Sequence, residues 1–124
     1  MNKGTRTKKT NEIISQTKMD MESLGIYKSQ YDIPIKRYSE MRLQYEVLKS
    51  EWIDDGCKIT EEYINKSGAT NIRKTAQYTA LEMLRKELFE IENTLGLTPK
   101  GYKAITNRAA KTKKASRLEA LLDG

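Results

Sequence analysis

Two pairs of neighbouring carboxylates and one thiol are the side chains of this chain that could most readily do chemistry. The pairs are Asp54 with Asp55 and Glu61 with Glu62, and Cys57 lies between them. Paired carboxylates could hold the divalent ions of a nuclease, but neighbours in sequence point in different directions on a helix or a strand. The thiol has no histidine to act as its base, because the chain contains none. We therefore expect no catalytic residue, no metal site, no cofactor and no enzymatic activity.

Phosphate-binding motifs of nucleotide enzymes are also missing from the sequence. It has no glycine-rich phosphate loop and no lysine in the context of a Walker motif. A lone cysteine cannot form an intrachain disulfide, and without histidine the chain cannot assemble a zinc site. The sequence therefore favours a binding protein over an enzyme.

Basic side chains are concentrated near both ends of the chain. Residues 1–18 carry a net charge of +4 and residues 99–124 carry +5, whereas residues 19–98 carry −3. An acidic body with two basic ends predicts a polyanionic partner, and solvated basic tails are the alternative interpretation. The candidate DNA contacts are Lys3, Arg6, Lys8, Lys9, Arg73, Lys74, Lys100, Lys103, Arg108, Lys111, Lys113, Lys114 and Arg117.

The length and composition indicate one helical domain with a thin core. The chain has 124 residues, of which 37% are apolar and 32% are charged, and its mean hydropathy is −0.76. No run approaches the roughly 18 apolar residues that a membrane span needs, and the first residues lack the apolar core of a signal peptide. We therefore expect no membrane partner and a cytoplasmic location.

Two long amphipathic helices are the elements that must position any site. The first is expected to begin near Asp32 as its N-cap, with Pro34 in its first turn, and to end at Gly56. The second is expected to begin at Asn71 and to end at Leu95, with Arg73 and Lys74 opposing the helix dipole in its first turn. Apolar stripes stepping by three and four residues predict that the two helices pair as an antiparallel hairpin. The stripes, which we also expect to form the core or the subunit interface, are Tyr38, Met41, Tyr45, Leu48 and Trp52, and Leu81, Leu84, Leu88, Ile91 and Leu95.

Shorter elements are expected around this hairpin. Strand-favouring and turn-favouring residues in 57–68 predict a short β-ribbon or an ordered loop at the hairpin tip. Residues 1–11 lack an apolar period and are expected to be flexible, and residues 12–24 are expected to form a short helix that Gly25 ends. The predicted fold is thus mainly α, an antiparallel helical hairpin with a ribbon or loop at its tip and short flanking helices.

A tight corner is expected after the second helix. Gly96 suits the left-handed residue that closes a helix, and Thr98 with Pro99 suits the cap and first turn of the next one. A short helix is expected over 99–110. A separate short helix is expected after it, because Ser116 and Glu119 have capping-box spacing before a small apolar face of Leu118, Leu121 and Leu122. Such a helix is typical of a segment that folds on docking to a partner.

The chain is accordingly divided into three parts. Residues 1–29 form a basic, partly flexible arm, residues 30–106 form a helical oligomerisation core, and residues 107–124 form a basic tail with a short helix. The hairpin alone is too thin to bury both apolar stripes fully, so self-association is expected.

The order of these features resembles a known family. An amphipathic helix with tyrosines and Trp52, a Gly-Cys-Lys-Ile connector, a second helix and the Gly-Leu-Thr-Pro corner at 96–99 are similar to the small terminase subunit of tailed phages, in the P27-like family. The resemblance covers roughly residues 30–105. The chain has Ile72 where the family usually has proline, and Lys100 and Gly101 where it usually has serine or alanine and an arginine-rich turn.

The resemblance implies a non-catalytic subunit that works in the cytoplasm of a bacterial host. Such subunits form rings, bind the start site on double-stranded phage DNA and recruit the large subunit, which supplies the ATPase and the nuclease. It makes Leu118, Leu121 and Leu122 the candidates for docking the large subunit. Two alternatives stay open: a helical adaptor that does not bind DNA, and a small DNA-binding regulator.

Overall fold

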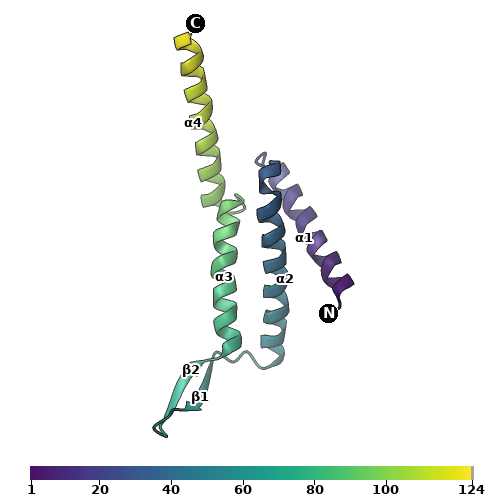
Figure 1. Ribbon diagram of the computed structural model, residues 1–124, viewed down its shortest axis with the longest axis vertical. Coiled ribbons are helices and arrows are strands. Elements are labelled where there is room, and N and C mark those ends of the chain that lie inside the picture. Colours follow the sequence, from purple (N-terminus) through teal and green to yellow (C-terminus); the bar gives the residue numbers. More distant parts are fainter. Residues whose placement is uncertain (124) are drawn as a thin grey trace.

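A long helical hairpin organises the computed structural model, which describes residues 1–123 (Figure 1). Helices α2 and α3 lie side by side and antiparallel, α1 leans against α2, and α4 projects beyond the end of the hairpin opposite the ribbon. This arrangement confirms the predicted fold class. The elements are α1 (Lys3–Ser23), a 3-10 turn (Ser29–Tyr31), α2 (Asp32–Asp54), β1 (Thr60–Ile64), β2 (Thr70–Lys74), α3 (Ala76–Thr94) and α4 (Pro99–Asp123).

The core lies at the end of the hairpin from which α4 leaves. There the end of α1, the start of α2 and the end of α3 meet, because each supplies apolar residues at helical spacing. Burial raises the pKa of the Tyr38 hydroxyl, because the cluster disfavours its charged form. The buried members of the cluster are Met21, Ile26, Ile35, Tyr38, Leu88 and Leu95.

The first helix is longer than the sequence predicts, and the expectation of a flexible 1–11 is wrong. Helix α1 already begins at Lys3, because Asn2 caps it by accepting a hydrogen bond from the Thr5 amide at 2.8 Å. Buried Thr17 and Met21 then anchor the helix on the rest of the fold. Gly25 ends it with a positive φ of 71°, as predicted.

Asp32 does not cap α2 in the predicted way. It is the first residue of the helix, Tyr31 occupies the cap position, and no side chain bonds the free amides there. The carboxylate of Asp32 instead accepts a hydrogen bond from the Tyr27 hydroxyl and pairs with Lys18 at 3.6 Å. The 3-10 turn that precedes α2 already has helical geometry, so the position of the cap moves back along the chain.

The ribbon at the hairpin tip is present, but its second strand comes from residues that were expected to start a helix. Strands β1 and β2 are antiparallel, with Thr60 opposite Lys74 and Ile64 opposite Thr70. Helix α3 therefore begins after Thr75 and not at Asn71, because Thr75 provides the cap by accepting from the Tyr78 amide at 3.2 Å.

The base of the ribbon is fixed to the helices by one carbonyl. The Trp52 indole N–H and the Thr75 hydroxyl each donate to the Lys58 carbonyl oxygen at 2.9 Å. The turn itself is held by the Asn65 side chain, which accepts from the Ser67 and Ala69 amides at 3.0 Å each. These bonds stabilise a two-stranded ribbon that would be marginal alone.

The predicted corner between α3 and α4 is confirmed. Gly96 has a φ of 73°, and the Leu97 amide donates back to the Glu92 carbonyl at 2.9 Å. Thr98 caps α4 by accepting from the Gly101 amide at 3.0 Å, and Pro99 is the first residue of the helix.

Beyond the corner, the prediction of two short helices is wrong. Helix α4 runs without a break from Pro99 to Asp123, so Ser116 and Glu119 lie inside it and form no capping box. The residues 107–117 are mostly lysine, arginine and alanine, which favour helix, and they include neither glycine nor proline to end it. Gly124, the last residue of the predicted tail, lies outside the described residues.

Replacing Leu81 with alanine is expected to lower the free energy of unfolding by about 2–4 kcal/mol, measured by urea denaturation. Leu81 is fully buried on the face of α3 that packs on α2, so the smaller side chain leaves a cavity. The matched control is Met83→Ala on the exposed side of the same helix, where 59% of the residue's surface is accessible and little change is expected. Equal losses in the two variants would contradict the assignment of this face to the core.

Candidate nucleic-acid interface

Helix α4 carries the most extended basic surface of the described chain. Lys100, Lys103, Lys111 and Lys114 recur at steps of three and four residues when Asn107 is included, so they lie in one row along the helix. All are exposed. Among the side chains that the structure describes, those of residues 1–122, no ion pair involves a basic side chain of α4. We call Lys100, Lys103, Lys111 and Lys114 the lysine row.

The orientation of α4 keeps the lysine row away from the body. Gly101 is buried and Ile105 is half-buried, and both lie on the side of α4 that packs on the corner. After this first contact the helix projects away from the hairpin (Figure 1). The remaining predicted contacts on α4, Arg108, Lys113 and Arg117, are exposed on other sides of the same helix.

The predicted contacts near the start of the chain lie on the first two turns of α1. Lys3, Arg6, Lys8 and Lys9 are exposed, and none of them takes part in an ion pair of the described structure. This end of α1 diverges from α2 and is far from α4 in Figure 1. A single copy of the chain therefore does not bring its two basic regions together.

Arg73 and Lys74 are not where the sequence placed them. They lie on strand β2 rather than in the first turn of a helix, so the argument from the helix dipole is wrong for them. Arg73 pairs with Glu61 at 3.0 Å and its guanidinium lies 4.6 Å from the centre of the Tyr63 ring.

Lys74 is likewise occupied by a carboxylate of the chain itself. It pairs with Glu82 at 2.9 Å, and the hydrogen bond with Glu82 raises the pKa of the Lys74 ammonium group. A lysine already neutralised by a neighbour releases fewer counterions from DNA than an unpaired one. These two residues are therefore weaker candidates for phosphate contacts than the basic residues of α4.

The predicted apolar stripes serve mainly to pack the hairpin on itself. Tyr38, Leu81, Leu88 and Leu95 are buried in the single chain. The other predicted members are half-buried, namely Met41, Tyr45, Leu48, Trp52, Leu84 and Ile91. Their remaining exposed surface stays a candidate for contacts between copies.

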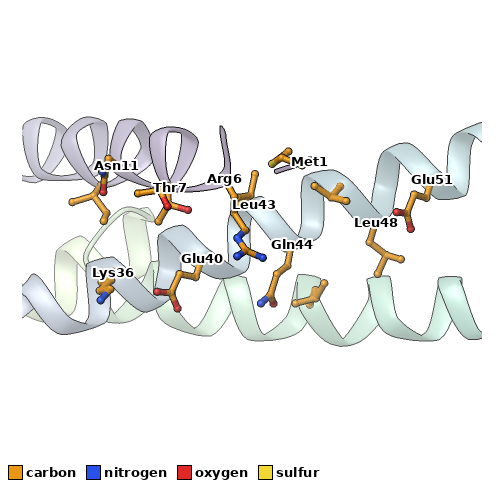
Figure 2. Close-up of a pocket in the computed structure, with 14 residues that line it drawn as sticks. Met1, Arg6, Thr7, Asn11, Lys36, Glu40, Leu43, Gln44, Leu48 and Glu51 are labelled. Atoms are coloured by element: carbon orange, nitrogen blue, oxygen red, sulfur yellow. The ribbon is translucent and has the colours of Figure 1, made fainter. Parts of the chain in front are cut away.

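A groove that the sequence analysis missed separates the first half of α1 from α2. It has a volume of about 990 Å³, and Figure 2 shows the side chains that line it. Leu43 and Val47 of α2 form part of its floor. The sequence held a partial signal, because Leu43 and Val47 are four residues apart and therefore lie on one side of α2.

The residues at the end of α4 are conspicuously uncovered. Leu118, Leu121 and Leu122 are 56%, 79% and 85% exposed. They share one side of the helix, because they are separated by three and four residues. Their docking to a large subunit stays a prediction.

The acidic pairs and the cysteine form no evident site. Within residues 1–123, no group of three or more histidine, cysteine, aspartate or glutamate residues is placed to hold a metal ion. Cys57 is exposed next to Gly56 at the end of α2 and has a positive φ of 56°. No helix in the described part of the chain combines the length and apolarity needed to cross a membrane.

Comparison with known proteins adds no relative from which function could be transferred. No protein-family model, no curated protein and no solved structure matches this chain.

Proposed function

We propose that this chain is the non-catalytic small subunit of a phage DNA-packaging terminase, similar to the P27-like family. In this proposal it forms a ring-like oligomer in the bacterial cytoplasm, binds double-stranded viral DNA, and recruits or regulates a large subunit that carries the ATPase and the nuclease. The resemblance across residues 30–105 suggests the family, and the charges of the chain support the DNA-binding role.

The lysine row of α4 is the observation that carries the DNA-binding part. Four ammonium groups in one line on a projecting helix can follow a phosphate backbone, and each one neutralised releases counterions into solution. Lysine contacts to phosphate position a protein on DNA without reading its sequence. Selection of a start site would then come from DNA shape or from repeated half-sites.

In this proposal, self-association strengthens DNA binding through multivalency. A single copy offers two separated basic regions, on α1 and on α4, and each alone provides a modest electrostatic contact. A ring repeats both regions around its circumference, so that binding of the first region raises the effective concentration of the others. The ring thus converts weak contacts into stable binding.

The proposal is tested by titrating a labelled DNA duplex with the full-length chain over a salt series and by measuring the mass of the protein in solution. The logarithm of the affinity is expected to fall linearly with the logarithm of the salt concentration, with a slope of about −4 or steeper. The mass should be that of a multimer of more than two copies. Absence of salt-dependent DNA binding would favour the helical adaptor. Salt-dependent DNA binding by a protein with the mass of a dimer would favour the small regulator.

A further inference from the structure

The groove between α1 and α2 is a place where a helix could be received. Its floor is apolar, with Leu43, Val47 and Leu48 from α2 and Leu84 from α3, and Ile14 of α1 adds one wall. The groove exists because the first half of α1 diverges from α2 (Figure 1). A volume of about 990 Å³ is large enough for several leucine side chains.

Charged side chains of both signs stand on the walls of this groove. Arg6 extends from α1 toward α2, and α2 carries Lys36 and Glu40 at one end of the groove and Glu51 at the other (Figure 2). A helix that fits here needs an apolar stripe with a basic residue on one flank and an acidic residue on the other.

The end of α4 has this pattern. Leu118, Leu121 and Leu122 form the stripe, with Arg117 on one side of it and Glu119 on the other by helical geometry. These leucines are the most exposed cluster of large apolar residues on any one helix of the described chain, and two of them are more than three-quarters exposed. An exposed apolar stripe of this kind on a projecting helix is typical of a surface that contacts a partner.

The two surfaces cannot meet within one chain. Helix α4 leaves the corner at Pro99 and is continuous, so at 1.5 Å per residue Leu118 lies roughly 28 Å further along the helix. That direction leads away from the hairpin, whereas the groove lies along α2 on the other side of the corner (Figure 1). The groove and the stripe are therefore available only to different copies.

We propose that Leu118, Leu121 and Leu122 of one copy bind in the α1–α2 groove of the next copy. Arg117 then faces Glu51 of that copy, and Glu119 faces its Arg6. The contact joins two different surfaces, so it leaves one free groove and one free stripe at the ends of any open assembly and is satisfied completely when the assembly closes into a ring. This inference rests on the ring-forming part of the proposed function and assigns the leucines to a second copy instead of the large subunit.

The contact also gives the lysine row a place in the assembly. The segment from Lys100 to Lys114 lies between the chain's own corner and the groove of its neighbour, so it bridges successive copies. DNA that follows the ring would meet one such segment at every junction.

Two variants, each damaging one side of the contact, test the proposal in the full-length protein. Leu121→Glu combined with Leu122→Glu places charges on the stripe, and Val47→Lys places one on the groove floor. Each is expected to weaken self-association by at least about 100-fold in a mass measurement over a dilution series. Phe89→Glu, at a 57% exposed position on α3 outside the groove, is the matched control and should leave the mass unchanged.

Mixing the two variants provides the sharper measurement. The stripe variant keeps an intact groove and the groove variant keeps an intact stripe, so an equimolar mixture is expected to give a species with the mass of two copies and nothing larger. Helical content measured by circular dichroism should match that of the unchanged chain in both variants, which separates loss of contact from loss of folding.

The outcomes separate this contact from the proposed function. A multimer that persists in both variants would overturn the contact. If the leucine variant also stays multimeric but no longer binds a large ATPase subunit, the leucines would be assigned to that subunit. An unchanged chain that is monomeric yet binds DNA would also overturn the contact. A monomeric chain that does not bind DNA would overturn the proposed function itself.

Discussion

Replacement of Gly101 by alanine is expected to lower the free energy of unfolding by about 2 kcal/mol or more, measured by urea denaturation. Alanine in place of glycine inside a helix ordinarily stabilises a protein by about 0.5–1 kcal/mol. At Gly101 a Cβ would lie 2.1 Å from the carbonyl oxygen of Asn93 and 2.8 Å from its carbonyl carbon and Cα. These are backbone atoms at the end of α3, so they cannot move aside without opening the corner.

The consequence of opening the corner extends to the core. Gly96 is buried in the same corner, and Ile26 and Ile105 pack so closely on it that a Cβ there would lie 2.5 Å and 2.8 Å from their Cδ1 atoms. Moving α4 away from Asn93 would weaken this packing. The orientation of α4, and with it the direction in which the lysine row projects, would then no longer be fixed by the corner. The matched control is Gly4→Ala in α1, where the nearest atom would be the Asn2 side-chain oxygen at 3.6 Å and a small stabilisation is expected. Stabilisation in both variants would show that the two helices do not approach so closely.

The hairpin and its corner could be predicted from the sequence because they depend on local signals. The steps of three and four from Tyr38 to Trp52 report a helix face whatever it packs against. Gly96, Thr98 and Pro99 each satisfy a requirement of the backbone within a few residues of themselves. No knowledge of distant parts of the chain was needed.

The start of α3 could not be predicted in the same way, because two residues compete to cap it. Asn71 and Thr75 are both good N-cap residues, and the sequence between them tolerates helix or strand. Pairing of Thr70–Lys74 with Thr60–Ile64, whose paired residues are on average ten positions apart in the sequence, decides for the strand. This is tertiary context overriding local preference.

The candidate site was predicted in part. The basic residues of α4 were identified from charge alone, but their alignment in one row depends on the helix continuing past residue 110, which the capping pattern at Ser116 argued against. The α1–α2 groove was missed because α1 was expected to begin only at residue 12, so no wall was foreseen opposite Leu43 and Val47. The close approach at Gly101 depends on a contact between two helices and leaves no local signal.

Replacing all four residues of the lysine row with alanine is expected to reduce affinity for duplex DNA by at least about 100-fold at about 0.1 M salt. The slope of log affinity against log salt should become less negative by about 3–4, since each lost phosphate contact removes about 0.9 from it. The measurement is fluorescence anisotropy of a labelled duplex over a salt series. Alanine has a higher helix propensity than lysine, so α4 itself is not weakened by the change.

The matched control removes the same number of charges elsewhere. Lys28, Lys58, Lys66 and Lys86 are exposed and lie outside α1 and α4, so their replacement by alanine changes the net charge identically but leaves the row intact. Replacing the four residues of the row with arginine should preserve binding, because arginine keeps the charge at each position. Equal losses of DNA affinity in the control and in the variant with alanine at the lysine row would mean that binding depends on the total charge of the protein. The lysine row would then have no special role. A loss confined to the row would place the phosphate backbone along α4.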